Sequence, residues 1–175
     1  MIMTSKRIAI VIASNNFRDE EYLVPKNIFT ERGIETWTLS SSIVPSKGIL
    51  GERIKPDRRV YDIDVSYFQA LVFVGGFGAR EYFRDAKVHE IIRGALHSGK
   101  VIGAICVAPS ILARAGVLNG RVATVYPSEK ECLLQSGALY SPDPVCRDGQ
   151  IITASGPEYA YDFALQIVEA IKSVV

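Results

Sequence analysis

Cys106 stands between two apolar segments whose residue types and spacing could support nucleophilic chemistry. The run ending at Ile105 has strand character, and the residues after Cys106 are compatible with a helix. Ala104 and Ala108 flank the cysteine at two residues on either side, which is the small-x-nucleophile-x-small spacing of a nucleophile elbow. An elbow aims the amides of the following helix at the sulfur, which favours a thiolate. A cysteine that is merely packed in the core remains the alternative.

Two further segments contain groups that could act with this cysteine. Gly75 and Gly76 follow an apolar run, and glycine amides beside a nucleophile can form an oxyanion hole, although a tight turn also explains them. The acidic run Asp19-Glu20-Glu21 opens a predicted helix, where the helix dipole alone accounts for acids. A protonated carboxyl beside the cysteine would also stabilise a thiolate.

The two histidines do not provide an obvious catalytic base. His89 and His97 lie on one predicted helix, and neither flanks the elbow, so we expect both on the surface. A peptidase of the Cys-His type needs an imidazole within hydrogen-bond reach of the sulfur. The residue after the nucleophile is Val107 instead.

Composition restricts the classes of function. A net charge of +1 without a basic block gives no electrostatic basis for binding nucleic acid or a membrane surface. The scattered Cys106, Cys132 and Cys146 argue against a disulfide framework and a metal site, and suit a reducing compartment. No apolar run approaches the roughly 20 residues of a membrane span, and the one after Arg7 is too short for a signal peptide. We therefore expect a cytoplasmic protein.

Apolar strand-length runs alternate with amphipathic helical patterns. The expected strands cover 7–13, 35–39, 70–74, the run before Cys106, 122–125 and 150–153. The expected helices cover 22–33, with a first turn made irregular by Pro25, then 87–98, the segment after Cys106, and 163–171; 47–60 is expected to form a hairpin or excursion. This alternation predicts one α/β domain over 1–175, with a mainly parallel sheet covered on both faces.

A sheet of this kind binds ligands beyond the carboxyl ends of its strands. Cys106, the pair Gly75-Gly76 and the segment 15–21 each follow a predicted strand. We therefore expect these three segments to share one pocket.

Five motifs in this order and spacing make the chain similar to the ThiJ/PfpI superfamily of cysteine-elbow proteins, which is class I glutamine amidotransferase-like. The motifs are Glu20-Glu21-Tyr22-Leu23-Val24-Pro25, Leu71-Val72-Phe73-Val74-Gly75-Gly76, Gly103-Ala104-Ile105-Cys106-Val107-Ala108-Pro109, Ala115-Gly116-Val117-Leu118-Asn119-Gly120-Arg121, and Thr153-Ala154-Ser155-Gly156-Pro157 leading into Phe163 to Ile171. The resemblance covers nearly the whole chain. It implies a flavodoxin-like three-layer sandwich with a cysteine nucleophile elbow.

The resemblance also implies roles for particular residues. Cys106 matches the reactive cysteine, and Glu21 matches the acid that hydrogen-bonds it and lowers its pKa. Gly75 and Gly76 match backbone donors beside the sulfur, with the Val107 amide contributing. Members of the superfamily form homodimers or larger oligomers, and use no cofactor. Arg53 is a further candidate, which we expect to reach a substrate across a dimer interface.

Two departures from the superfamily pattern bear on the chemistry. PfpI-type proteases carry histidine directly after the cysteine, where this chain has Val107. The deglycase branch has a histidine at a position that corresponds to Tyr126 here, and a tyrosine is a poor base near neutral pH. Ser155-Gly156-Pro157 nevertheless makes the chain resemble the deglycase branch more.

Three functions are consistent with these residues. The first is an enzyme of the glyoxalase III or deglycase kind, in which the Cys106 thiolate adds to a small reactive carbonyl and Glu21 moves a proton. The second is a redox sensor or protective protein in which an oxidant converts Cys106 to a sulfinate. The third is a PfpI-type cysteine peptidase or amidase, which the missing histidine disfavours.

Overall fold

A seven-stranded sheet runs through the middle of the protein, as seen in a computed structural model that describes residues 6–173. Its strand order is β11-β12-β8-β7-β1-β3-β6, and all neighbours are parallel except the edge pair β11 and β12. The strands are β1 (Arg7–Val11), β3 (Glu35–Ser40), β6 (Arg58–Arg59), β7 (Ala70–Phe73), β8 (Val101–Ile105), β11 (Val145–Asp148) and β12 (Ile151–Ala154). The predicted α/β architecture with a mainly parallel sheet is confirmed.

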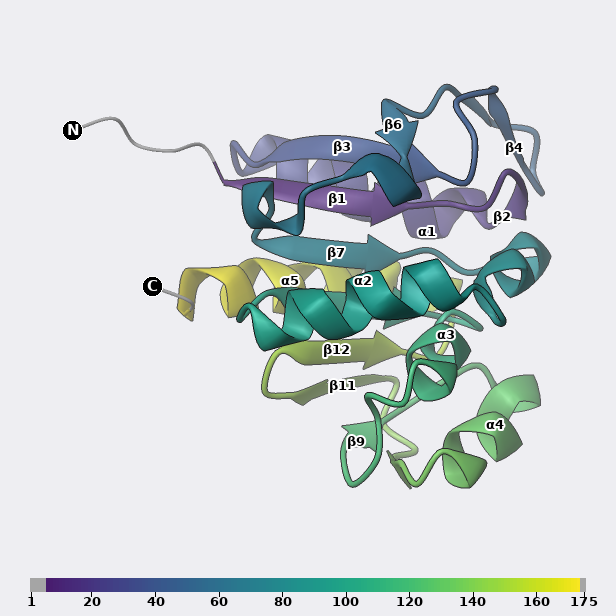
Figure 1. Cartoon of the computed structure of the whole chain (residues 1–175), viewed down its shortest axis with the longest axis vertical. Helices are drawn as coiled ribbons and strands as arrows, with labels where there is room; N and C mark the ends of the chain where they lie inside the picture. Colours follow the sequence, from purple (N-terminus) through teal and green to yellow (C-terminus); the bar gives the residue numbers. More distant parts are fainter. Residues whose placement is uncertain (1–5, 174–175) are drawn as a thin grey trace.

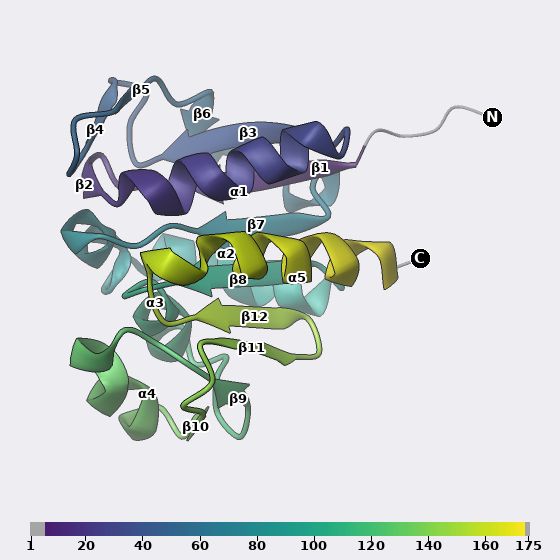
Figure 2. The same cartoon turned by 180° about the vertical axis from the view of Figure 1, so that it is seen from behind.

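Helices cover both faces of this sheet and complete three layers. One face carries α1 (Asp19–Glu31) and α5 (Ala160–Ser173), which pack against each other and lie in front in Figure 2. The other face carries α2 (Ala86–His97) and α3 (Pro109–Arg114), in front in Figure 1. The short helix α4 (Lys130–Gln135) packs on α3.

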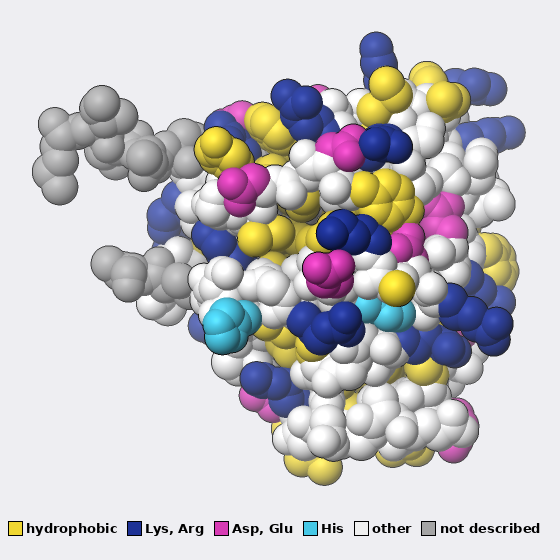
Figure 3. Space-filling model, in the orientation of Figure 1, with side chains coloured by type: hydrophobic (Ala, Val, Ile, Leu, Met, Phe, Trp, Pro, Cys, Tyr) yellow, Lys and Arg dark blue, Asp and Glu magenta, His cyan; other side chains and the backbone are white. Residues whose placement is uncertain are grey.

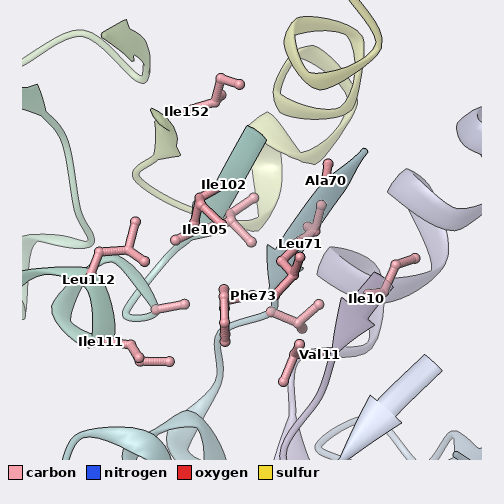
Figure 4. Close-up of a cluster of buried hydrophobic side chains, with 14 of the residues drawn as sticks. Ile10, Val11, Ala70, Leu71, Phe73, Ile102, Ile105, Ile111, Leu112 and Ile152 are labelled. Carbon is pink, nitrogen blue, oxygen red and sulfur yellow. The ribbon is translucent and has the colours of Figure 1, made fainter. Parts of the chain in front are cut away.

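The core lies between the sheet and its helices, because the central strands are apolar on both faces. Ile10, Leu71 and Ile102 come from β1, β7 and β8 and are fully buried in one cluster (Figure 4). Gly103 lets α5 approach β8, since a Cβ there would lie 2.8 Å from the Ile167 side chain. Close helix contact on β8 fixes the strand that leads to Cys106.

Two small sheets stand apart from the main one. β2 (Asn15–Phe17), β4 (Ser46–Gly48) and β5 (Arg53–Ile54) form a three-stranded sheet, in which β4 and β5 are the predicted hairpin. β9 (Val122–Ala123) pairs only with β10 (Leu139–Tyr140), so the expected strand over 122–125 is shorter and lies outside the main sheet. Single turns of 3-10 helix connect these parts at η1 (Val60–Asp62), η2 (Val65–Tyr67), η4 (Pro127–Glu129) and η5 (Pro157–Tyr159), and a longer one is η3 (Phe77–Tyr82).

The first helix differs from its prediction in one respect. α1 begins at Asp19 and continues through Pro25 without interruption, so the expected irregular first turn is not present. Pro25 removes only the helical N–H that would bond the carbonyl of Glu21. Across residues 6–173, none of the helices combines the length and apolar character needed to cross a membrane.

Candidate active site

Cys106 sits on a sharp turn directly after β8. Figure 2 shows that β8 points the same way as its neighbours β7 and β12, so the turn lies at the end of the sheet where these parallel strands terminate. Its backbone φ of 63° is in the left-handed region, which residues other than glycine rarely adopt. The turn is fixed on both sides, because the Cys106 N–H donates to the Ala154 carbonyl and the Cys106 carbonyl accepts from the Tyr126 N–H, each at 2.8 Å. The predicted elbow is therefore present, with its strain held by two distant segments.

Glu21 lies in the first turn of α1 and brings a buried carboxyl to the elbow. Its Oε2 accepts a hydrogen bond of 2.7 Å from the Gly75 N–H. Its Oε1 is buried and has no hydrogen-bond partner among residues 6–173. Burial raises the pKa of Glu21 to about 8, against the opposing effect of the Gly75 bond. At pH 7 the carboxyl is thus mainly protonated, and Oε1 is the oxygen free to carry the proton.

Gly75 brings the acid and the cysteine together by having no side chain. A Cβ at this position would lie 2.6 Å from Glu21 Oε2 and 2.8 Å from the Cys106 Cβ, so the two side chains close over the glycine from different directions. The expectation that the Gly75 amide donates to the sulfur is wrong, because that amide is bonded to Glu21. Gly75 therefore has two roles. Its missing side chain lets Glu21 and Cys106 pack closely, and its amide holds the Glu21 carboxyl.

Neighbouring groups shift the pKa of the Cys106 thiol in opposite directions. Burial and the carboxyl of Glu21 raise the pKa of the Cys106 thiol above its usual value, whereas the amides of Gly76 and Val107 lower it. The expectation of a thiol pKa lowered by the elbow therefore needs correction. Glu21 raises this pKa partly through its negative charge and partly through a side-chain hydrogen bond, and a protonated Glu21 removes the part due to the charge.

A pocket of about 320 Å³ opens over Cys106. Two exposed aromatic side chains belong to its lining, Phe77 at 72% and Tyr126 at 44% exposure. The complete lining is Arg18, Glu21, Ile49, Gly76, Phe77, Arg80, Cys106, Val107, Tyr126, Ser128, Pro157 and Glu158. Segments more than eighty residues apart thus meet at one site, as expected from the topology.

The pocket includes most of the candidate residues. Glu21, Gly76, Val107 and Tyr126 line it together with Cys106, but Arg53 lies on β5 and is not part of its lining. The histidines are absent from the lining as well; His89 is on α2 and bonds the Tyr82 carbonyl through Nε2, and His97 is exposed at the end of the same helix.

The acidic run in α1 is more specific than its helix position alone suggested. Asp19 is buried and accepts hydrogen bonds from the Leu50 N–H at 2.8 Å and the Glu52 N–H at 2.9 Å. This fixes the turn between β4 and β5, which carries Ile49 into the pocket lining. Glu20 binds the Arg18 side chain. All three acids therefore have separate structural partners.

Sequence reasoning missed Arg18 and Arg80, which both line the pocket. Arg18 directly precedes the acidic run, and that adjacency was the available signal. Arg80 lies on η3, and nothing in its local sequence separates it from an ordinary surface residue. Within residues 6–173 there is no cluster of three acidic, histidine or cysteine side chains that could hold a metal ion.

The elbow, the buried acid and the sheet order together correspond to a recognised family. A model of the DJ-1/PfpI family matches residues 6–170. The chain belongs to the DJ-1/PfpI family. The resemblance to the ThiJ/PfpI superfamily that rested on five sequence motifs is thereby confirmed.

Relatives in this family carry several names. An uncharacterized protein of Methanocaldococcus jannaschii is 38% identical over 97% of this chain and 84% of its own length. A glutathione-independent glyoxalase of Caenorhabditis elegans is 29% identical over 97% and 91% of the two chains. Further family relatives at 28% to 29% identity are named deglycases. Among solved structures, a ThiJ/PfpI domain protein from Brachyspira murdochii has a TM-score of 0.95 and 29% identity, covering 98% of this chain and 99% of that one.

Proposed function

We propose that this protein acts on small reactive carbonyl compounds, in the manner of a glyoxalase or deglycase, with Cys106 as the nucleophile. The observation that carries the proposal is the buried Glu21 carboxyl, which has one oxygen bonded to the Gly75 amide and lies beside Cys106. A neutral acid so placed can deliver a proton to a developing oxyanion. The names of several relatives support the same chemistry.

The Cys106 thiol first loses its proton to solvent water, because Glu21 is already protonated at pH 7. The resulting thiolate then adds to a carbonyl carbon. A bond forms between Sγ and carbon, and the electron pair of the C=O π bond moves to oxygen. That oxygen takes the proton from Oε1 of Glu21, which leaves a hemithioacetal and an ionised Glu21. The amides of Gly76 and Val107 are the backbone donors near the sulfur. They stabilise negative charge in this part of the site until the Glu21 proton has been transferred.

Consumption of methylglyoxal without glutathione tests the proposal. We expect the protein to consume it, Cys106→Ala to be inactive, and Glu21→Gln to lose at least tenfold in rate, because an amide cannot release the proton. Cys132→Ala is the matched control for loss of a thiol and keeps full activity. Methylglyoxal that disappears no faster with the protein than with Cys106→Ala contradicts the proposal.

A second candidate is a redox sensor that senses peroxide through Cys106. It is favoured by the donors around the sulfur, namely the Gly76 and Val107 amides and a protonated Glu21. The thiolate attacks peroxide, forming S–O while O–O breaks and water leaves; a second equivalent gives the sulfinate, whose oxygens these donors bind. Mild peroxide should add two oxygens at Cys106 alone, and Glu21→Leu should lose this selectivity. Equal oxidation of Cys132 and Cys146 contradicts the candidate.

Peptidase activity is not expected. The departing amine of a peptide needs a proton from a positioned acid, and the pocket lining contains no imidazole. Hydrolysis of casein that depends on Cys106 would contradict this expectation.

A further inference from the structure

Two arginine side chains line the pocket beside Cys106 and have no role in the addition step. Arg18 immediately precedes α1, and Arg80 lies on η3, which follows β7. They reach the same cavity from different connections at the carboxyl end of the sheet. We therefore consider which part of a substrate these two arginines would bind.

Each guanidinium group is held in place by a carboxylate that does not itself line the pocket. Arg18 Nε and Nη2 donate to the two carboxylate oxygens of Glu20 at 2.9 and 3.1 Å. Arg80 Nη2 donates to Glu129 Oε1 at 2.9 Å, and Glu129 Oε2 accepts from the buried Ser110 Oγ at 3.2 Å. Prepositioned side chains lose less conformational freedom when a ligand binds.

These anchors leave donors available on both arginines. A guanidinium group has five N–H donors in a planar fork that matches a carboxylate. Glu20 uses Nε and one Nη2 donor of Arg18, and Glu129 uses one Nη2 donor of Arg80. The remaining N–H groups can donate to an anion in the cavity.

The ionised groups that line the pocket are two arginines and one carboxylate. Arg18 and Arg80 are positive, and Glu21 is mainly uncharged at pH 7 because burial raises its pKa to about 8. The remaining acid is Glu158, which folds back over Gly156, since a Cβ on that glycine would lie 2.6 Å from Glu158 Oε2. Glu20 and Glu129 each balance one arginine from outside the lining, so an anion would be bound through the remaining N–H donors of the two guanidinium groups.

We propose that the pocket selects a small carbonyl compound that also carries a carboxylate, with the carbonyl carbon at Cys106 and the carboxylate bound by Arg18 and Arg80. The inference rests on the proposed function, because it requires Cys106 to be the nucleophile. The addition step keeps its balance: the thiolate charge passes to the carbonyl oxygen and is neutralised by the Glu21 proton. The substrate carboxylate remains ionised throughout.

Alkylation of Cys106 by iodoacetate and by iodoacetamide tests this selection. The reagents are similar in size and differ in charge, and in both cases an S–C bond forms as iodide leaves. The rates at Cys106 are measured at pH 7 by peptide mass spectrometry. Their ratio is informative because both reagents consume the same thiolate, so any change in its pKa cancels.

We expect iodoacetate to be favoured over iodoacetamide at Cys106 by about tenfold relative to the same ratio at half-buried Cys132. Arg18→Gln and Arg80→Gln should each lower the Cys106 ratio about threefold to tenfold. Arg84→Gln is the matched control, since Arg84 is exposed, lies near η3 and is outside the pocket lining. Its ratio should equal that of the unaltered protein.

The outcomes separate the two proposals. If the arginine variants leave the ratio at Cys106 unchanged while the protein still consumes methylglyoxal faster than Cys106→Ala, the anion selectivity is wrong and the nucleophile stands. If methylglyoxal disappears no faster with the protein than with Cys106→Ala, the proposed function itself is overturned.

Discussion

The Oε2 atom of Glu21 and the backbone N–H of Gly75 are 2.7 Å apart and form a hydrogen bond within the buried site. This bond determines which oxygen of the acid accepts and which is left to donate. The amide can only be a donor, so the oxygen bonded to it is the unprotonated one when the acid is neutral. The proton therefore lies on Oε1, the oxygen without a partner.

The pH dependence of Cys106 alkylation should change with Glu21. In the unaltered protein the rate should rise with pH and flatten above about pH 8, because ionised Glu21 then opposes the thiolate. Glu21→Gln keeps a neutral donor and should remove the flattening. Glu21→Leu removes the donor and should slow the reaction at pH 7 about tenfold, which corresponds to one pKa unit. Identical profiles for all three proteins would rule out this role.

Stability should fall as pH rises from 5 to 9. Burial raises the folded-state pKa of Glu21 to about 8 from a usual value of 4.5, so the folded state binds the proton more tightly. The resulting stabilisation is complete below pH 4.5 and is lost as pH rises through 8. We expect a loss of roughly 3–5 kcal/mol in the free energy of unfolding, measured by urea denaturation. Glu21→Gln should show a loss smaller by that amount.

Gly75→Ala should damage both the fold and the site. The added methyl group would overlap Glu21 Oε2 and the Cys106 Cβ, and overpacking of this kind costs about 1–3 kcal/mol. The rate of Cys106 alkylation should fall as the acid is displaced. Gly94→Ala is the matched control, because nothing lies within 4 Å of its new Cβ in α2. That variant should gain about 0.5–1 kcal/mol, and equal stability of the two variants would contradict the packing argument.

The protein should form a homodimer through the surface near β4 and α1. Val44 and Leu50 are 69% and 63% exposed on the connections that flank β4. Figure 3 shows hydrophobic side chains beside basic ones at the end of the molecule that carries β4. Light scattering should report a dimer at micromolar concentration, and Val44→Glu or Leu50→Glu should shift it toward monomer. Leu139→Glu, on the distant β10, should remain dimeric; a monomeric unaltered protein would refute the expectation.

The main sheet could be predicted because its strands are continuous apolar runs, and burial on both faces produces such runs. The small sheets could be predicted only in part: the hairpin of β4 and β5 and a strand at 122–125 were expected, but β2 and β10 have three and two residues and carry no readable period. Their pairing depends on tertiary contacts, as when Asp19 holds the turn between β4 and β5. α1 was predicted, but its regular path through Pro25 was not.

The candidate site divides in the same way. Cys106 could be selected from its elbow spacing, whereas Glu21 was singled out of its acidic run through the resemblance to the ThiJ/PfpI superfamily. The use of the Gly75 amide could not, since it depends on an acid 54 residues away in the sequence. Arg80 was equally invisible, because its place in the pocket depends on Glu129 in another connection.

The Cys106 turn also sets the order in which the site appears during protein synthesis. Its N–H is bonded to the carbonyl of Ala154, and β12 is the neighbour of β8 in the sheet. At 5–20 residues per second, the ribosome adds Ala154 about 2–10 s after Cys106. Until then the nascent chain lacks the segment that holds the left-handed turn. The emerging polypeptide therefore carries an ordinary cysteine, and the nucleophile forms only after β12 has been made.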